Sequence, residues 1–329
     1  MPRCSKKFLG EFMGCLKPIQ VYNLKKGEKA KFKRFNSIEK LTKDMNRYYE
    51  NNNAVPCRKC IGCKLDNSKE WAVRSALECK SSNDNWFITL TYADEFIPTN
   101  NEGRYTCRYS DLRRFTENLR QFFTRQNIRN IKYLASSEYG SRTQRPHYHI
   151  CFFGLPLNDL ELTGEVSKLG HPYYISKVVD KIWGKGMHKI GRVTYQSAGY
   201  VARYTLKKAN KLAYKELGIE PEKLYMSKGI GKNYFEDNFK DIYQYDVINL
   251  NTEKGLLKLQ PPRYFDRLYE KQNAKHLEMI KKNRIVNAKF HLTTSVQESG
   301  IGYVGLLGNQ QHILHERVKN LKRIVKNNK

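Results

Sequence analysis

The sequence lacks an apolar run near the roughly 18 residues of a membrane-spanning helix, and its start lacks the apolar core of a signal peptide. It is also poor in acidic residues. Against 60 Lys and Arg, only 32 Asp and Glu occur among the 329 residues, which gives a formal net charge of +28. Such an excess indicates a polyanionic partner, with nucleic acid the first candidate and no membrane partner expected.

A phosphate-binding loop is also lacking. The segment Gly229-Ile230-Gly231-Lys232-Asn233 has neither the spacing nor the hydroxyl residue of that motif. We therefore expect no fused phosphate-loop helicase. Disulfide staples are not expected either, because the eight cysteines are spread through a chain large enough to build its own core.

The segment Arg145–Phe153 is rich in apolar and aromatic residues and predicts a β-strand. On a strand, His147 and His149 project from one face and Tyr148 from the other. A preceding strand, Ile131–Ser137, and a short polar loop predict a hairpin that brings Glu138 near the two histidines. A carboxylate with two imidazoles is a candidate site for Mg²⁺ or Mn²⁺. The alternative is two half-buried histidines beside a solvated glutamate.

Downstream, Ser197 predicts the start of a helix that contains two tyrosines. Tyr200 and Tyr204 are four residues apart and Lys207 is three further on, so all three share one helical face. Arg203 and Lys208 add positive charge to the same helix. Two tyrosines at this spacing are usually packing residues, but so many cations are unusual on a face that packs into a core. A tyrosine can attack a phosphodiester where a cation polarises the phosphate.

Cys57, Cys60 and Cys63 are three residues apart, which indicates part of a thiolate site for structural Zn²⁺. Cys4, Cys15 and Cys79 are the candidates for a fourth ligand. The spacing is similar to the start of a ferredoxin motif, but the next expected cysteine position is Asn67, so an iron–sulfur cluster is poorly supported. The alternative is three reduced, partly buried thiols.

The remaining patterns predict alternating helices and strands. Helices are expected at 64–80, from Ser110 through Phe123, and at 177–183, and strands at 86–92 and 187–195. We divide the chain into an N-terminal segment 1–63, a core 64–210, an extension 211–270 and a basic helical extension 271–329. The last is expected to bind a DNA backbone or a partner.

Taken together, these motifs are similar to those of the rolling-circle replication initiators, the two-histidine (HUH) endonucleases. More closely, the chain resembles the replication initiators of the gokushoviruses (Microviridae), which are related to the coliphage gene A proteins. The resemblance covers about residues 56 to 270. It is carried by Cys57–Cys63, Ser68–Arg74, Phe87–Tyr92, Glu138–Gly140, Arg145–His149, Tyr200–Tyr204, Met226–Tyr234 and Pro261–Tyr264.

The resemblance implies an α+β fold, a mainly antiparallel sheet of about five strands with flanking helices. It implies that His147, His149 and Glu138 hold the metal ion, and that Tyr200 or Tyr204 attacks the scissile phosphate. Lys207 would then position or neutralise charge, while Arg145, Arg203 and Lys208 would contact DNA.

The implied function is nicking of the viral origin in the double-stranded replicative form. The product is a 5′-phosphotyrosine and a 3′-OH that primes rolling-circle replication, and a second transfer reseals the displaced strand into a circle. A host polymerase and a host helicase are the implied partners, in the bacterial cytoplasm. Two alternatives stay open: a plasmid relaxase or single-strand transposase with the same chemistry, and a non-enzymatic basic protein that binds single-stranded DNA.

Overall fold

The computed structural model describes residues 15, 19–22, 31–34, 54–167, 170–203, 211–252, 255–301 and 303–319. The described residues form two compact units. One contains those within Met1–Asn67 and Asn273–Lys322, and the other contains those within Ser68–Gln272. Within the described ranges, no helix is both long enough and apolar enough to cross a membrane.

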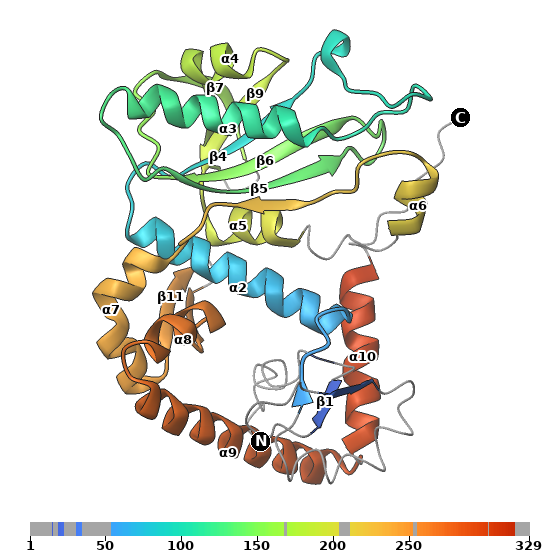
Figure 1. The fold of residues 1–329 in the computed structure, drawn as a ribbon, viewed down its shortest axis with the longest axis vertical. Helices are drawn as coiled ribbons and strands as arrows, with labels where there is room; N and C mark the ends of the chain where they lie inside the picture. Colours follow the sequence, from blue (N-terminus) through green and yellow to red (C-terminus); the bar gives the residue numbers. More distant parts are fainter. Residues whose placement is uncertain are drawn as a thin grey trace. The chain divides into compact units, whose positions relative to one another are not determined.

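The second unit is built on a seven-stranded sheet in which every pair of neighbours is antiparallel (Figure 1). The strand order is β10-β5-β6-β4-β9-β8-β7. The central strands are β5 (Lys132–Tyr139), β6 (Pro146–Phe153), β4 (Trp86–Thr91) and β9 (His188–Arg192). The outer strands are β10 (Leu224–Met226), β8 (Pro172–Ser176) and β7 (Leu160–Val166).

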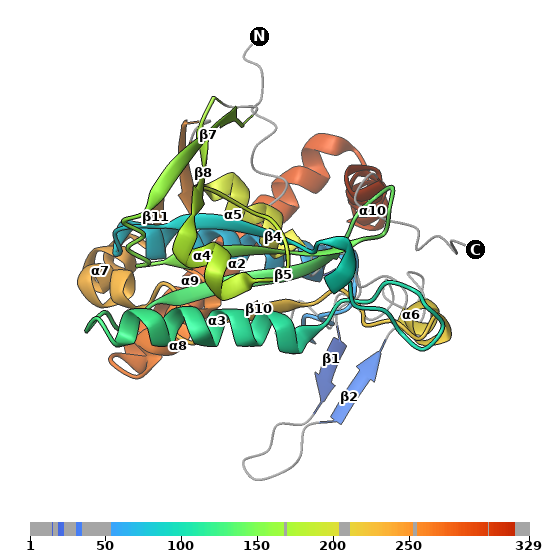
Figure 2. The ribbon, with the colours of Figure 1, turned by 90° about the horizontal axis from the view of Figure 1, so that it is seen from above.

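Helices α3 (Tyr109–Thr124) and α4 (Lys177–Trp183) cover one face of the sheet, as both views show (Figures 1 and 2). Alternate residues of the central strands, such as Ile88 and Ile150, pack there against Phe115 and Trp183 in the main hydrophobic core. This face therefore supplies most of the apolar burial that holds the central strands in place.

The opposite face packs against α2 (Ile61–Lys80) and α5 (Tyr195–Ala202). Cys151 and Phe153 of β6 contact Ala198 and Val201 of α5 in a smaller buried cluster. Because side chains alternate along a strand, the residues at positions 147 and 149 face this same side. The packing of α5 thus sets which side chains lie over the two histidines.

The predicted α+β class, with a mainly antiparallel sheet and flanking helices, is confirmed. The sheet has seven strands rather than about five. The sequence patterns predict β4, β5, β6 and β9, whereas β7, β8 and the three-residue β10 were not predicted. Two expected caps are also wrong. Thr194 rather than Ser197 caps α5, with Ser197 completing a capping box, and Arg108 rather than Ser110 precedes α3.

The rest of the second unit consists of η1 (Asp94–Phe96), α6 (Lys211–Glu216), α7 (Lys232–Tyr245), the hairpin of β11 (Ile248–Thr252) and β12 (Gly255–Leu259), and α8 (Arg263–Glu270). The first unit contains a small sheet of β1 (Ile19–Tyr22), β2 (Lys31–Arg34) and β3 (Ala54–Val55), with α9 (Ala274–Ser299) and α10 (Tyr303–Lys319). The boundaries at 63, 210 and 270 stay predictions.

Candidate active site

The β5–β6 hairpin brings together the three predicted metal ligands. In its register Glu138 lies opposite His147, and Ser136 lies opposite His149. Glu138 is fully buried, whereas the side chains of His147 and His149 are 19% and 11% exposed. The expectation that the hairpin places a carboxylate beside both imidazoles is therefore confirmed.

Both imidazoles approach the same carboxylate oxygen. Glu138 Oε2 lies 3.3 Å from His147 Nε2 and 3.0 Å from His149 Nε2. The ligand atoms of the three residues all lie within 4.8 Å of one another. One divalent cation can therefore be bound by all three after small side-chain adjustments, with positions left over for a phosphate oxygen.

The other ring nitrogen of each histidine also has a partner. His147 Nδ1 lies 3.2 Å from the carbonyl oxygen of Arg145 and must donate to it. His149 Nδ1 lies 3.0 Å from the Thr89 hydroxyl. With Nδ1 donating to the carbonyl, Nε2 of His147 faces a carboxylate oxygen. A cation shared between them would stabilise this arrangement, so the residues fit a metal.

Thr89 was not among the predicted site residues. It reaches the site because β4 pairs with β6 in a register that sets Thr89 opposite His149. Phe87, two residues earlier on the same face of β4, stacks on the His149 ring with a centroid distance of 5.6 Å. The threonines of the 86–92 strand were a signal, but only the pairing register shows which hydroxyl faces a histidine.

Of the two predicted tyrosines, Tyr200 is among the residues that the structure describes. It lies on α5, and its side chain contacts the same carboxylate. Its hydroxyl donates to Glu138 Oε2 over 2.8 Å, and its ring centroid lies 5.2 Å from that of His149. The exposed Arg203 follows the last turn of α5, with its guanidinium 5.8 Å from the Tyr200 ring centroid. A tyrosine hydroxyl, a carboxylate and two imidazoles thus converge in one place.

The structure describes only some of the other predicted site residues. Tyr204, Lys207 and Lys208 lie outside the described residues. Arg145 is paired with Asp94 and also donates to the Tyr92 carbonyl oxygen over 2.8 Å, so its guanidinium already has protein partners.

Tyr148 points away from the histidines, as predicted. It is buried on the α3 side of the sheet, where its hydroxyl donates to the Arg108 carbonyl oxygen over 2.8 Å and lies 3.0 Å from the Tyr92 hydroxyl. Burial raises the pKa of Tyr148 well above that of a free tyrosine, so it stays neutral. This residue belongs to the core.

The predicted cysteines also gather, in the first unit. Cys15, Cys57, Cys60 and Cys63 form a group whose sulfur atoms lie within 4.8 Å of one another. Of the other fourth-ligand candidates, Cys79 packs in the hydrophobic cluster beneath the sheet, and Cys4 lies outside the described residues.

Comparison with known proteins identifies the family. The family model described as Replication-associated protein ORF2/G2P matches residues 85–209, a range that contains Thr89, Glu138, both histidines and both tyrosines. The chain is 48% identical to the Replication-associated protein ORF2 of Spiroplasma virus 4 over 320 residues, which cover 96% of this chain and all of that protein.

Two further relatives agree. The Replication-associated protein VP4 of Bdellovibrio phage phiMH2K is 32% identical over 79% of this chain and 78% of its own length. The Replication-associated protein ORF4 of Chlamydia phage 1 is 29% identical over 66% of this chain and 54% of its own length. No solved structure is significantly similar to the chain. The predicted relationship is confirmed: the chain belongs to the ORF2/G2P family of phage replication-associated proteins.

Proposed function

We propose that this phage replication protein is a metal-dependent HUH-type endonuclease and strand transferase that starts rolling-circle replication by nicking the viral origin. The observation that carries the proposal is the approach of the Tyr200 hydroxyl to Glu138, the carboxylate that both histidines also contact. A nucleophile and a metal-ligand set on one rigid sheet and its covering helix are the parts that this chemistry requires.

His147, His149 and Glu138 would hold Mg²⁺ or Mn²⁺. The mixture of two imidazoles and one carboxylate suits Mn²⁺ at least as well as Mg²⁺, because Mg²⁺ prefers oxygen ligands. When bound, the ion would polarise a non-bridging oxygen of the scissile phosphate. Three neighbouring residues would hold the two imidazole rings in position. The Arg145 carbonyl oxygen orients His147 and the Thr89 hydroxyl orients His149. Phe87 covers one face of the His149 ring.

Tyr200 would be the nucleophile. Its hydroxyl already donates to Glu138 over 2.8 Å, so its proton has an acceptor within reach. The phenolic oxygen forms the new bond to phosphorus, and the bond from phosphorus to the 3′ oxygen breaks. The 3′ oxygen leaves with a proton, so the products are a 5′-phosphotyrosine and a free 3′-OH. Because the phosphotyrosine keeps the energy of the original bond, the later joining step needs no ATP.

Tyr204 would supply the second cut, which closes the displaced strand into a circle. It is four residues beyond Tyr200 in sequence, and the family model covers both residues. Lys207 would position or neutralise charge at the phosphate. These two roles rest on the motif, because both residues lie outside the described ranges.

DNA binding is supported by charge. The net charge of +28 favours contacts with the phosphate backbone, and Arg203 lies beside Tyr200, where a bound strand would pass if Tyr200 is the nucleophile. Arg145 and Lys208 are the other proposed contacts. A host polymerase would extend the 3′-OH, and a host helicase would separate the strands, with the protein acting in the bacterial cytoplasm.

A nicking assay tests the proposal. Supercoiled plasmid that carries the phage's own origin should be relaxed by the protein with Mg²⁺ or Mn²⁺ and not with EDTA. The combined variant His147→Ala/His149→Ala should lose cleavage but keep most of its DNA affinity, because backbone contacts dominate binding. A non-enzymatic DNA-binding protein would bind the plasmid without relaxing it. A relaxase or transposase would cleave its own recognition sequence and spare the phage origin.

A further inference from the structure

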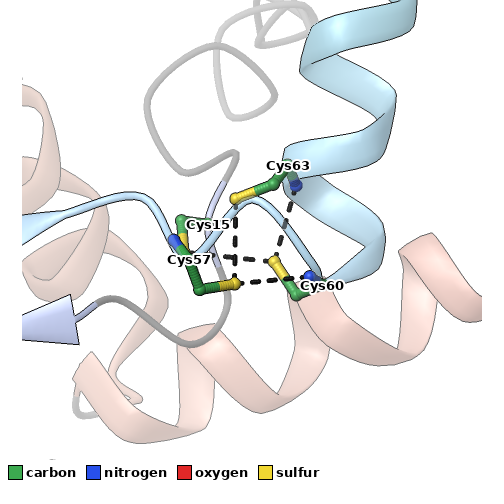
Figure 3. A group of neighbouring side chains, drawn as sticks. All are labelled: Cys15, Cys57, Cys60 and Cys63. Carbon is green, nitrogen blue, oxygen red and sulfur yellow. Dashed lines mark hydrogen bonds between the residues drawn. The ribbon is translucent and has the colours of Figure 1, made fainter. Parts of the chain in front are cut away.

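We infer that Cys15, Cys57, Cys60 and Cys63 form a structural zinc site, with the distant Cys15 as the fourth ligand. Figure 3 shows the four side chains gathered at the start of α2, with Cys63 in its first turn and Cys57 and Cys60 in the loop before it. The inference concerns the first unit and does not depend on the proposed endonuclease activity.

The sulfur positions match the geometry of one tetrahedral ion. Cys57 Sγ lies 4.0 Å from Cys63 Sγ, and Cys60 Sγ lies 4.0 Å from Cys15 Sγ. Four thiolates at about 2.3 Å from a zinc ion are separated by about 3.8 Å. A small contraction of the group therefore produces the zinc geometry.

The same distances argue against two other states of these cysteines. A disulfide needs its sulfurs about 2.05 Å apart, and none of these four cysteines forms one. In a cubane iron–sulfur cluster each thiolate binds a different iron, so the four sulfurs lie farther apart than around a single ion. A group held within 4.8 Å fits one metal ion better.

Backbone amides also point at the sulfur atoms. Cys57 N donates to Cys15 Sγ over 3.2 Å, Cys60 N to Cys57 Sγ over 3.3 Å, and Cys63 N to Cys60 Sγ over 3.5 Å. Hydrogen bonds of this kind hold the ligand atoms of a metal site in their orientation. The turn that makes these bonds holds Arg58 at a φ of 58°, a conformation uncommon for a non-glycine residue.

A zinc ion at this site would stabilise the small sheet of the first unit. Cys15 lies just before β1 and Cys57 just after β3, and these strands pair with Ile19 opposite Val55. In an antiparallel pair, the start of one strand lies beside the end of the other. Zinc would therefore join the ends of a small sheet whose strands have four, four and two residues. Sheets this small bury little apolar surface, and metal sites commonly stabilise such modules.

The test counts zinc on the full-length chain, purified under reducing conditions without chelators. The His147→Ala/His149→Ala variant serves as the background, because it removes the other candidate metal group and leaves the cysteines unchanged. Elemental analysis should find roughly one zinc per chain in this background. Adding Cys15→Ala or Cys60→Ala should lower the zinc content at least tenfold. Cys79→Ala is the matched control, since Cys79 lies on α2 outside the group, and it should keep its zinc.

A second measurement does not depend on the folding of the cysteine variants. In the background protein, alkylation followed by peptide mapping should show the four cysteines protected with zinc and reactive after its removal. Replacement by Co²⁺ should give the visible absorption of a tetrahedral tetrathiolate complex. Absence of zinc, iron with sulfide in its place, or full zinc retention in Cys15→Ala would each overturn the assignment.

Discussion

Replacing Thr89 by valine tests how the histidines are held. The Thr89 hydroxyl lies 3.0 Å from Nδ1 of His149, and valine keeps the shape and the β-branching of the strand residue while removing this partner. Without the hydroxyl, His149 loses the Nδ1 partner that holds its ring with Nε2 directed at the Glu138 carboxylate. We expect weaker metal binding rather than a slower chemical step.

The size of the effect follows from the surroundings of His149. Partners of ligating histidines are typically worth about 10–100-fold in metal affinity or activity. Phe87 still stacks on the ring in the variant and limits its rotation, which favours the lower end of this range. A tenfold loss corresponds to about 1.4 kcal/mol, close to the value of a single hydrogen bond.

The assay is plasmid nicking across a Mn²⁺ titration. Thr89→Val should raise the half-saturating Mn²⁺ concentration about tenfold, with a maximal rate near that of the wild type. Thr91→Val is the matched control. It lies two residues further along the same face, opposite His147, but its hydroxyl donates to the Met187 carbonyl oxygen. Thr89→Ser should restore the wild-type titration. Equal half-saturation in the Thr89→Val and Thr91→Val variants would refute the role given to His149 Nδ1.

Three further predictions concern the ligand carboxylate, a buried ion pair and a buried histidine. Glu138→Ala should raise the metal requirement by more than about 100-fold, beyond the effect of any ring partner; an unchanged titration would remove Glu138 from the site. Lys132→Met removes the ion-pair partner of the buried Glu78 carboxylate, which lies 2.8 Å from Lys132 Nζ. The free energy of unfolding, measured with denaturant, should fall by about 3 kcal/mol. Arg113→Met, which breaks an exposed pair, should cost below about 0.5 kcal/mol, and equal losses would contradict this difference. Burial lowers the pKa of His188 in the folded protein. Just below about pH 6.5, therefore, His188 takes up a proton in the unfolded chain but not in the folded one. The free energy of unfolding should fall as the pH drops through that range. His188→Gln should flatten this part of the stability curve.

The sequence carried enough information to predict the core of the site. Alternation placed His147 and His149 on one face, and a short polar loop between two strands implied the hairpin that brings in Glu138. These relations are local, because they depend on a strand's period of two and on one tight connection.

Relations between distant segments could not be predicted in the same way. Thr89 reaches His149 through pairing of strands 60 residues apart, and several cysteines were equal candidates for the position that Cys15 takes. Strand β7 was missed because its Leu162 and Val166 are exposed, so it has no core-facing pattern to detect. Three-residue β10 is too short to give a signal. Tertiary packing decides such features.

A tyrosine of the 199–208 segment should become covalently joined to the 5′ end of the nicked strand. The direct measurement is mass spectrometry of the adduct formed on a labelled single-stranded origin oligonucleotide with Mn²⁺. We predict an adduct on Tyr200 or Tyr204. Each single Tyr→Phe variant should still form some adduct but release few closed circles. The double variant should form no adduct. An adduct mapped outside residues 199–208, or cleavage by the double variant, would rule out these two tyrosines as the nucleophiles.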